Sequence, residues 1–291
     1  MKPPPFVYHR PGNVDETLDT LADVGSDGKI LAGGQSLVPL MSMRLAAPAH
    51  LIDINGLSEL GHIRVGDDGV QVGATVRHAQ LERDEVAFAA QPLLRQALRH
   101  VAHPTIRNRG TSVGSLAHAD PAGELTAVLA LLGGTVTLRS RAGERTVAAA
   151  DFFLGPLESA VRPEELATSA FFPTLPRWTG SAWTEVSRRN GDYALCGVGA
   201  LVTLDGDSRI ASARVGLISV GPTPVVVNIS ESLAGRRAND ATFDEAARTV
   251  EDAVDPEPDI HATAEYRRHL AGVLTARALA DATNQALEAT T

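Results

Sequence analysis

The sequence has little of what several classes of protein need. Of its 291 residues one is a cysteine, Cys196, so the chain cannot hold an internal disulfide, a thiolate zinc site or an iron–sulfur cluster. Aromatic residues make up 4%, and acidic residues outnumber basic ones by 35 to 26, which argues against nucleic acid as a partner. Any redox chemistry in this chain therefore needs an organic cofactor.

Long hydrophobic runs are absent as well. No segment approaches the roughly 20 apolar residues of a membrane span, and the opening MKPPPFVYHRPG has no apolar stretch typical of a signal peptide, so we expect a cytoplasmic protein. Lysine is scarce, since Lys2 and Lys29 are the only two. The neighbours of Lys29, DGKILAGG, indicate a turn entering a strand, which disfavours a Schiff-base mechanism.

The first third of the chain alternates predicted strands with turns. A strand over residues 29–31 stops at the glycine pair 33–34, and Pro39 limits the next segment to a short helix or turn. A second strand over 50–54 completes a compact β–turn–β unit. Thr75 is the expected N-cap of a helix that follows.

The later part of the chain predicts a long loop and a domain boundary. Residues 104–123 are rich in Gly, Ser, Thr, Asn and Asp and lack periodicity, which is typical of a functional loop. The sequence PTLP at 173–176 marks a boundary, beyond which strands precede helices, as in an α+β domain with an antiparallel sheet. We expect domains over 1–176 and 177–291.

Two glycine-bearing turns have the composition of anion-binding loops. AGGQSL at 32–37 and RGTSVGSLAHAD at 109–120 combine bare backbone N–H groups with short hydroxyl side chains, and together they could clamp a pyrophosphate. Ordinary turns share this composition, so both interpretations stay open. If phosphates lie there, a side chain at Gly33 or Gly114 would occupy their space.

Two enzyme motifs match less well. The glycine pair followed by Asp53 imitates a dinucleotide-binding unit, but the third glycine is missing and a full crossover helix does not fit before Leu51. Residues 110–114 match G-x-S-x-G, the nucleophile turn of α/β-hydrolases, with Ser112 as nucleophile. The preceding TIRNRG is too polar for the buried strand that this motif requires.

Two histidine pairs have spacings that metal ligands use. His100 with His103, and His118 with Asp120, could each contribute two ligands, but no third ligand lies nearby with helical spacing. Histidines at helix ends more often interact with terminal carbonyls. We therefore predict no metal in this chain.

Five segments, in one order along nearly the whole chain, carry a family resemblance: AGGQSLVPLMSMRLAAPAHLIDING, RNRGTSVGSLAHADPAGEL, ADFFLGP, RRNGDYALCGVGA and DIHATAEYRRHLAGVLTARAL. Together they resemble the FAD-binding medium subunit of molybdenum hydroxylases, of the carbon monoxide dehydrogenase type. The resemblance implies a flavoprotein oxidoreductase subunit in a heterotrimer, with dimers of heterotrimers expected. A large partner would carry molybdopterin, and a small partner would carry 2Fe–2S clusters that pass electrons through FAD to an external acceptor.

The resemblance also implies an α+β fold class. Two N-terminal α/β subdomains, at about 1–57 and 58–176, would clamp FAD in a PCMH/VAO-type fold. A C-terminal α+β domain over 177–291, with an antiparallel sheet and helices, would follow.

The resemblance places the cofactor contacts residue by residue. The first pyrophosphate loop corresponds to Ala32, Gly33, Gly34, Gln35, Ser36 and Leu37, and the second to Thr111, Ser112, Val113, Gly114 and Ser115. Lys29 is expected near the adenosine, and Val161 and Leu166 are expected against the adenine. Val101 and Ala102 are expected to contribute through their backbone. Asp120 is expected close to the cofactor, and Tyr193 beside the isoalloxazine ring. No side chain is expected to act as acid or base, and none stands where the family would attach FAD covalently.

Two positions depart from the family pattern. Val113 replaces a glycine and is tolerated only with a negative φ, so the second loop could be remodelled. Glu185 stands where relatives often carry lysine, and a carboxylate near the flavin would lower its reduction potential. These departures motivate the alternative of a structural subunit whose flavin site is degenerate.

Overall fold

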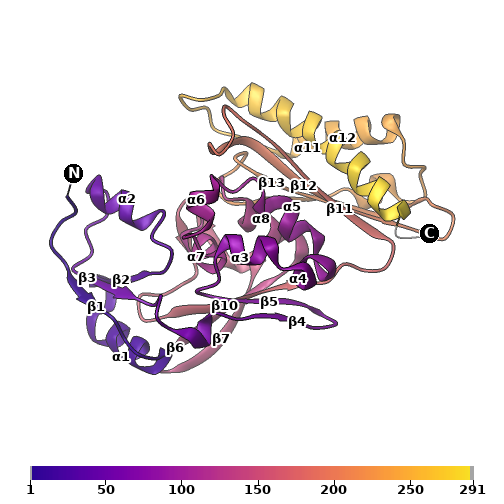
Figure 1. The fold of residues 1–291 in the computed structure, drawn as a ribbon. Helices are drawn as coiled ribbons and strands as arrows, with labels where there is room; N and C mark the ends of the chain where they lie inside the picture. The colour runs from indigo at the N-terminus through magenta and orange to yellow at the C-terminus, as the bar shows by residue number, and fades with distance from the viewer. Residues whose placement is uncertain (1, 289–291) are drawn as a thin grey trace.

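Three larger β-sheets and one small hairpin organise residues 2–288, the part of the chain that the computed structural model describes (Figure 1). The first sheet has the order β1-β3-β2, and both of its pairings are parallel. Helix α1 begins after Asn13, whose side chain accepts a hydrogen bond from the Glu16 N–H, and it buries Leu18 and Leu21. The bounds are β1 Val7–His9, α1 Val14–Val24, β2 Gly28–Leu31, α2 Leu37–Ser42 and β3 His50–Asp53.

The second sheet is antiparallel, with the order β4-β5-β10-β6-β7. Its core side chains Val70, Val72, Val136 and Phe172 are fully buried. The strands are β4 Ile63–Val65, β5 Gly69–Gly73, β6 Thr135–Ser140, β7 Gly143–Ala148 and β10 Leu166–Pro173, with the hairpin β8 Phe153–Gly155 and β9 Glu158–Ser159. The helices are α3 His78–Arg83, α4 Glu85–Ala90, α5 Pro92–Leu98, α6 Pro104–Arg107, α7 Ser112–His118, α8 Glu124–Leu132 and α9 Ala149–Phe152.

The third sheet is antiparallel in the order β11-β12-β13-β14 and is covered on both faces. Helix α12 packs on β11 and β12, while α8 of the preceding region packs on β13 (Figure 1). Within residues 2–288 no helix is both long and apolar enough to cross a membrane. The bounds are β11 Thr179–Ser187, β12 Ala194–Leu204, β13 Ile210–Ile218, β14 Val225–Asn228, α10 Ser230–Leu233, α11 Asp240–Ala253 and α12 Ala264–Glu288.

The structure corrects the predicted β–turn–β unit. Strands β2 and β3 are parallel, and the segment between them contains α2, which makes the connection a short crossover. Pro39 is the third residue of α2. A proline is tolerated there because the first helical N–H groups have no acceptor within the helix.

Two further predictions were wrong in detail. The segment 104–123, predicted as a loop, contains the short helices α6 and α7. The helix expected to start at Thr75 starts at His78, with Arg77 as its N-cap residue. Both errors arise because helices of four to seven residues are too short to show periodicity.

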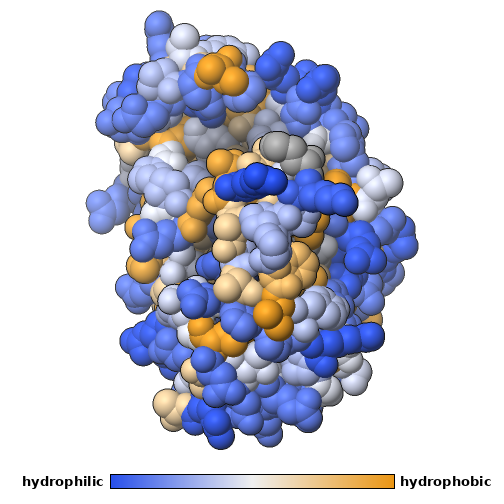
Figure 2. Space-filling view, turned by 90° about the vertical axis from the view of Figure 1, so that its left-hand side faces the viewer, coloured by the Kyte–Doolittle hydropathy of each residue, from blue (hydrophilic) through white to orange (hydrophobic). Residues whose placement is uncertain are grey.

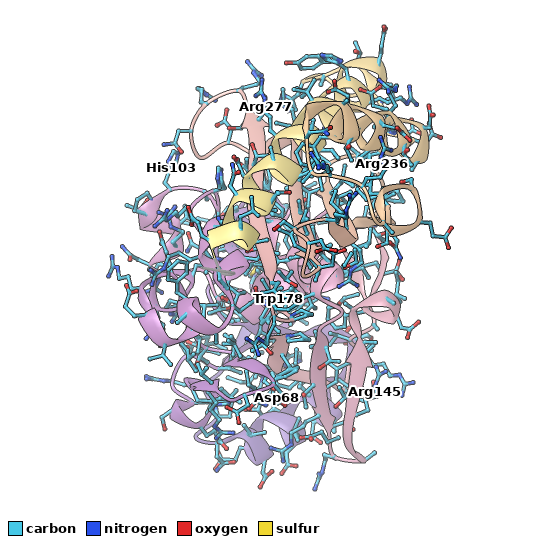
Figure 3. All side chains as sticks on the ribbon, turned by 90° about the vertical axis from the view of Figure 1, so that its right-hand side faces the viewer. Asp68, His103, Arg145, Trp178, Arg236 and Arg277 are labelled. Atoms are coloured by element: carbon cyan, nitrogen blue, oxygen red, sulfur yellow. The ribbon has the colours of Figure 1, made fainter. Side chains whose placement is uncertain are left out.

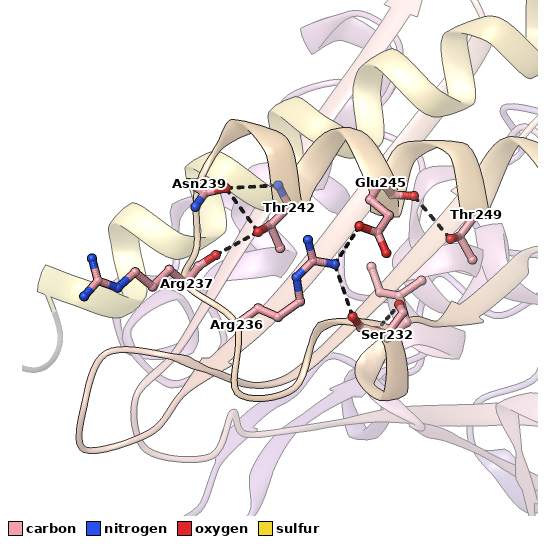
Figure 4. Close-up of polar contacts among 8 residues, drawn as sticks. Ser232, Arg236, Arg237, Asn239, Thr242, Glu245 and Thr249 are labelled. Atoms are coloured by element: carbon pink, nitrogen blue, oxygen red, sulfur yellow. Dashed lines mark hydrogen bonds and ion pairs between the residues drawn. The ribbon is translucent and has the colours of Figure 1, made fainter.

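The start of α11 is stabilised by a side-chain cap, shown in Figure 4. The Asn239 Oδ1 accepts hydrogen bonds from the backbone N–H of Thr242 at 3.0 Å and from its Oγ1 at 3.1 Å. Arg236 donates to Glu245 at 2.7 Å and so ties the preceding turn to the same helix.

We expect Asn239→Ala to lower the free energy of unfolding by about 1 kcal/mol, because the first turn of α11 loses its acceptor. Urea denaturation followed by circular dichroism measures the change. Asn284→Ala, at an exposed position inside α12, is the matched control and should leave stability unchanged within about 0.5 kcal/mol. Equal losses in both variants would contradict the capping role.

Candidate functional site

The two glycine-bearing turns touch each other. A Cβ atom on Gly33 would lie 2.5 Å from the Arg109 carbonyl oxygen and 2.6 Å from the Gly110 Cα, so only glycine allows this approach. Ala32 lies beside Gly114, where an added Cβ would be 3.8 Å from its methyl group. The space beside Gly33, which sequence reasoning gave to phosphates, is therefore filled by the backbone of the second turn.

The first turn presents unused hydrogen-bond donors. Within residues 2–288, the backbone N–H groups of Gly33, Gly34, Gln35 and Ser36 donate to no other group, and all four residues are partly exposed. Gly34 has a φ of 72°, in the left-handed region. Consecutive free N–H groups of this kind bind anion oxygens.

The second turn forms the start of α7. Thr111 is its N-cap residue and accepts a hydrogen bond from the Gly114 N–H at 3.2 Å, while the buried Ser112 Oγ has no partner among the described residues. Val113 is 1% exposed and lies in the helix, so its side chain packs in the core and its φ is negative. The valine is thus accommodated in the helix, and Ser112 lacks the exposure that a hydrolase nucleophile needs.

Arg77 connects the two turns to the first sheet. Its guanidinium donates to the Arg109 carbonyl and to the Asn55 Oδ1, the latter at 2.6 Å, while Arg77 also forms a β-bridge with Thr111. Asn55 in turn bonds to Asp53. Sequence reasoning missed Arg77, because a single arginine in VRHAQ carries no motif.

Asp53 and Arg107 have structural partners. The Asp53 carboxylate accepts a hydrogen bond from the Tyr8 hydroxyl and others from Asn55, which agrees with a strand-end role. The Arg107 guanidinium donates to the carbonyls of Val101 and Ala102 at 3.0 and 3.1 Å. It thereby holds the backbone before the second turn, where Ala102 has a φ of 44°.

Tyr193 lies at the edge of the same region. It is 69% exposed, but its hydroxyl lies toward Asp120. Desolvation of the hydroxyl, followed by the nearby carboxylates of Asp120 and Glu124, raises the pKa of Tyr193. Tyr193, just before β12, and Asp120, just after α7, therefore lie close together in the structure.

The remaining predicted positions are more dispersed. Lys29 is exposed on β2, Leu37 begins α2, and Ser115 lies in α7 with its hydroxyl unpaired among residues 2–288. Val161 packs against the core beyond β9, and Leu166 is 1% exposed at the start of β10. Among these five, Leu166 is the one whose side chain lies in the buried core.

The histidines form no metal site in the described part of the chain, where no group of three or more potential ligands gathers. His100 Nδ1 lies 3.5 Å from a Glu185 oxygen, and His118 Nε2 lies 4.0 Å from Asp120. His103 packs against Gly191, where an added Cβ would lie 2.3 Å from its ring.

Comparisons with known proteins decide the family. Residues 4–175 match the family described as FAD binding domain in molybdopterin dehydrogenase, and residues 181–282 match the CO dehydrogenase flavoprotein C-terminal domain. The chain belongs to the FAD-binding medium subunits of molybdenum hydroxylases. This confirms the resemblance and the fold class predicted from the sequence.

Relatives of this FAD-binding subunit are similar along their whole length. The alpha subunit of the 6-hydroxypseudooxynicotine dehydrogenase complex of Paenarthrobacter nicotinovorans is 39% identical, over 98% of this chain and 97% of its own. The carbon monoxide dehydrogenase medium chain of Afipia carboxidovorans is 35% identical, over 96% and 97%. Quinoline 2-oxidoreductase from Pseudomonas putida 86 superimposes with a TM-score of 0.94 at 35% identity, over 99% of this chain and 100% of its own.

The residues at the two turns fit FAD. Free N–H groups at 33–36 are donors of the kind that a pyrophosphate needs, and two contacting turns can bind it from two sides. Glu185, the second departure from the family pattern, points into the domain junction. There the Trp183 indole N–H donates to its carboxylate at 3.1 Å.

Proposed function

We propose that this subunit transfers electrons, taking them from 2Fe–2S clusters of a small partner subunit and passing them to an external acceptor. Bound FAD supplies the chemistry of this step, since it exchanges electrons singly or in pairs. The observation that carries the proposal is the contact between the turns at Gly33 and Gly110, which places free donors of the first turn beside the second.

The proposed FAD contacts are the positions carried over from the family. The turns 32–37 and 111–115 would bind the pyrophosphate, with Lys29, Val101, Ala102, Val161 and Leu166 toward the adenosine and Asp120 and Tyr193 toward the flavin ring. We propose that this site belongs to a domain over 1–176, with subdomains at about 1–57 and 58–176, followed by a C-terminal domain over 177–291.

The proposed partners are a large molybdopterin-binding subunit and a small iron–sulfur subunit, in a cytoplasmic dimer of heterotrimers. Figure 2 looks onto the side where α2 lies and shows hydrophobic side chains gathered in the middle of that face. The segment around α2 exposes Val38 at 46%, Met43 at 53% and Leu45 at 73%. Exposed apolar surface of this kind is typical of a subunit interface.

We propose that FAD binds without a covalent bond. Cys196 is fully buried, and burial raises the pKa of its thiol to about 12, so it is neither accessible nor nucleophilic. Acid precipitation tests this: the flavin should stay in the supernatant, and yellow colour in the pellet would contradict the proposal.

The absorption spectrum of the purified full chain tests FAD binding itself. Bands of oxidised flavin, at one FAD per chain after reconstitution, are expected. A colourless, folded chain that takes up no FAD would favour the alternative of a structural subunit with a degenerate site. Reconstitution with both partners then tests electron transfer, because flavin that stays oxidised while the clusters are reduced would contradict it.

Tyr193→Ala is expected to weaken FAD retention and to change the rate of flavin reoxidation. The exposed ring of Tyr193 shields the proposed flavin position from water, and its removal opens that face. Flavin content and stopped-flow reoxidation measure the two effects. Tyr266→Ala, an exposed tyrosine on α12, is the control, and identical traces for both variants would remove Tyr193 from the site.

A further inference from the structure

A cavity lies between the short helices α3, α4, α5 and α6, which Figure 1 shows close to one another. Its volume is about 370 Å³, which is within the range of sites for small molecules. None of the positions proposed to contact FAD lines it. The lining includes four arginines and two glutamates, so the cavity has an excess of two positive charges in a chain whose net charge is −9.

Two of the arginines form a fixed base of this cavity. The side chains of Arg95 and Arg107 are each 11% exposed. The Arg95 guanidinium lies 4.0 Å from the centre of the Phe88 ring. It donates to the Glu82 carbonyl at 2.7 Å and to the Glu85 carboxylate at 3.1 Å. Arg107 donates to the Glu82 carboxylate at 2.9 Å and to two backbone carbonyls. These contacts hold both guanidinium groups in place and neutralise both glutamates.

The cavity still has unused donors. Within residues 2–288, Arg107 Nη2 donates to no group, and the buried Arg95 Nη2 makes no hydrogen bond, although it lies 3.0 Å from a Glu85 oxygen. The other two arginines, Arg83 at the end of α3 and Arg99 directly after α5, are exposed. Their guanidinium groups have no partner in the described part of the chain. The excess positive charge therefore lies on free guanidinium groups.

This arrangement of donors favours a phosphate group as the ligand. Guanidinium groups pair bidentately with the oxygens of phosphates and carboxylates. The four arginines come from α3, α5 and α6, so their donors approach a ligand from several directions. A tetrahedral phosphate presents oxygens in several directions, whereas a carboxylate presents two in one plane. Of the described residues that line the cavity none is aromatic, so a nucleobase would find no stacking surface.

We propose that this cavity binds the phosphate or pyrophosphate group of a small metabolite that has no aromatic base. Arg83 and Arg99 are its main ligands, and Arg95 and Arg107 lie at its base. The site is separate from the FAD site and does not depend on the proposed function. Arg107 also holds the backbone before the second glycine-bearing turn, so the test leaves this residue unchanged.

Isothermal titration calorimetry of the full chain at low ionic strength tests the site, with inorganic pyrophosphate as the probe. FAD is present at saturation, so that it occupies the two glycine-bearing turns. Binding of one pyrophosphate per chain is expected. Arg83→Gln combined with Arg99→Gln should raise the Kd about tenfold or more, because two partners of charge-assisted hydrogen bonds are lost. No binding to the wild-type chain, or an unchanged Kd in the double variant, overturns the proposal.

Arg248→Gln combined with Arg277→Gln is the matched control. Both residues are exposed, on α11 and α12, and neither lines the cavity, so this variant loses the same charge elsewhere. Its Kd should stay within about twofold of the wild-type value, because salt screens distant exposed charges. An equal rise in both double variants would show a general attraction of anions and would overturn the site.

The same titrations without FAD separate the cavity from the FAD site. If the chain takes up no FAD, the proposed function fails, but the effect of Arg83→Gln with Arg99→Gln on pyrophosphate binding still decides the cavity. Pyrophosphate binding that persists in this double variant and disappears when FAD is added places the anion at the glycine-bearing turns, which overturns the cavity as its site.

Citrate distinguishes phosphate from carboxylate as the ligand chemistry. It carries three carboxylates, and we expect its Kd to be about tenfold or more above that of pyrophosphate, because planar carboxylates use fewer of the donors. A citrate Kd equal to that of pyrophosphate, or lower, would contradict the assignment to a phosphate group.

Discussion

Gly33→Leu is expected to abolish FAD binding. A side chain at this position cannot be accommodated, because its Cβ would lie 2.5 Å from the Arg109 carbonyl oxygen and 3.0 Å from the Thr111 nitrogen. The two turns would separate, and the first turn with its free N–H groups would no longer lie against the second. Flavin content per chain after reconstitution measures the loss, with circular dichroism to show that the fold remains.

Gly206→Leu is the matched control for this experiment. Gly206 lies between β12 and β13, and an added Cβ there meets no atom within 4 Å, so flavin content should equal that of the wild type. Normal flavin content in the folded Gly33→Leu chain would remove the contact between the turns from the proposed site.

Arg267→Met is expected to give the largest loss of stability, about 1–3 kcal/mol. Arg267 is 6% exposed on α12 and donates to the carbonyls of Leu195 and Ser219, at 2.7 and 3.1 Å, and to Asp259 at 2.7 Å. Methionine keeps most of the volume but leaves the buried Leu195 carbonyl without this donor. Urea denaturation of the full chain measures the change.

The control for Arg267 lies on the same helix. Arg277, labelled in Figure 3, is exposed, so Arg277→Met should change stability by no more than about 0.5 kcal/mol. Similar losses in the two variants would show that the helix tolerates neither substitution. The buried hydrogen bonds of Arg267 would then not account for its contribution to stability.

The same ion pair predicts part of the acid sensitivity. Burial alone would raise the pKa of Asp259, but the N–H groups of His261 and Ala262 and the Arg267 guanidinium lower it from 3.8 to about 2. The folded pKa is depressed, so this contribution is fully present above about pH 4 and is lost as the pH falls toward 2. Asp259→Asn should flatten the stability curve in that window, and an unchanged slope would contradict the assignment.

Regular elements could be predicted because their patterns are long. The alternation in TVTLRS predicts β6 over its observed range, and the helical period in ATFDEAARTVEDAV predicts α11 to within one residue at each end. The parallel pairing of β2 with β3 could not be predicted, because the sequence of such a short strand does not determine whether it pairs in parallel or antiparallel.

The site could be predicted in its parts but not in its assembly. Glycine and serine in AGGQS and TSVGS indicate anion-binding turns on local chemistry alone. The contact of Gly33 with Gly110, and the clamp by Arg77 and Asn55, depend on where distant segments meet.

The position of β12 has a consequence for how the chain reaches its native state. Ten of its eleven residues are buried, which requires that both faces of the sheet be covered. Helix α8 covers one face, where its Leu131 lies against Gly199 of β12 and Gly216 of β13. A fragment starting near residue 177 would expose that face to water and would tend to self-associate. The C-terminal region is therefore expected to complete its folding against the N-terminal region, which emerges from the ribosome first.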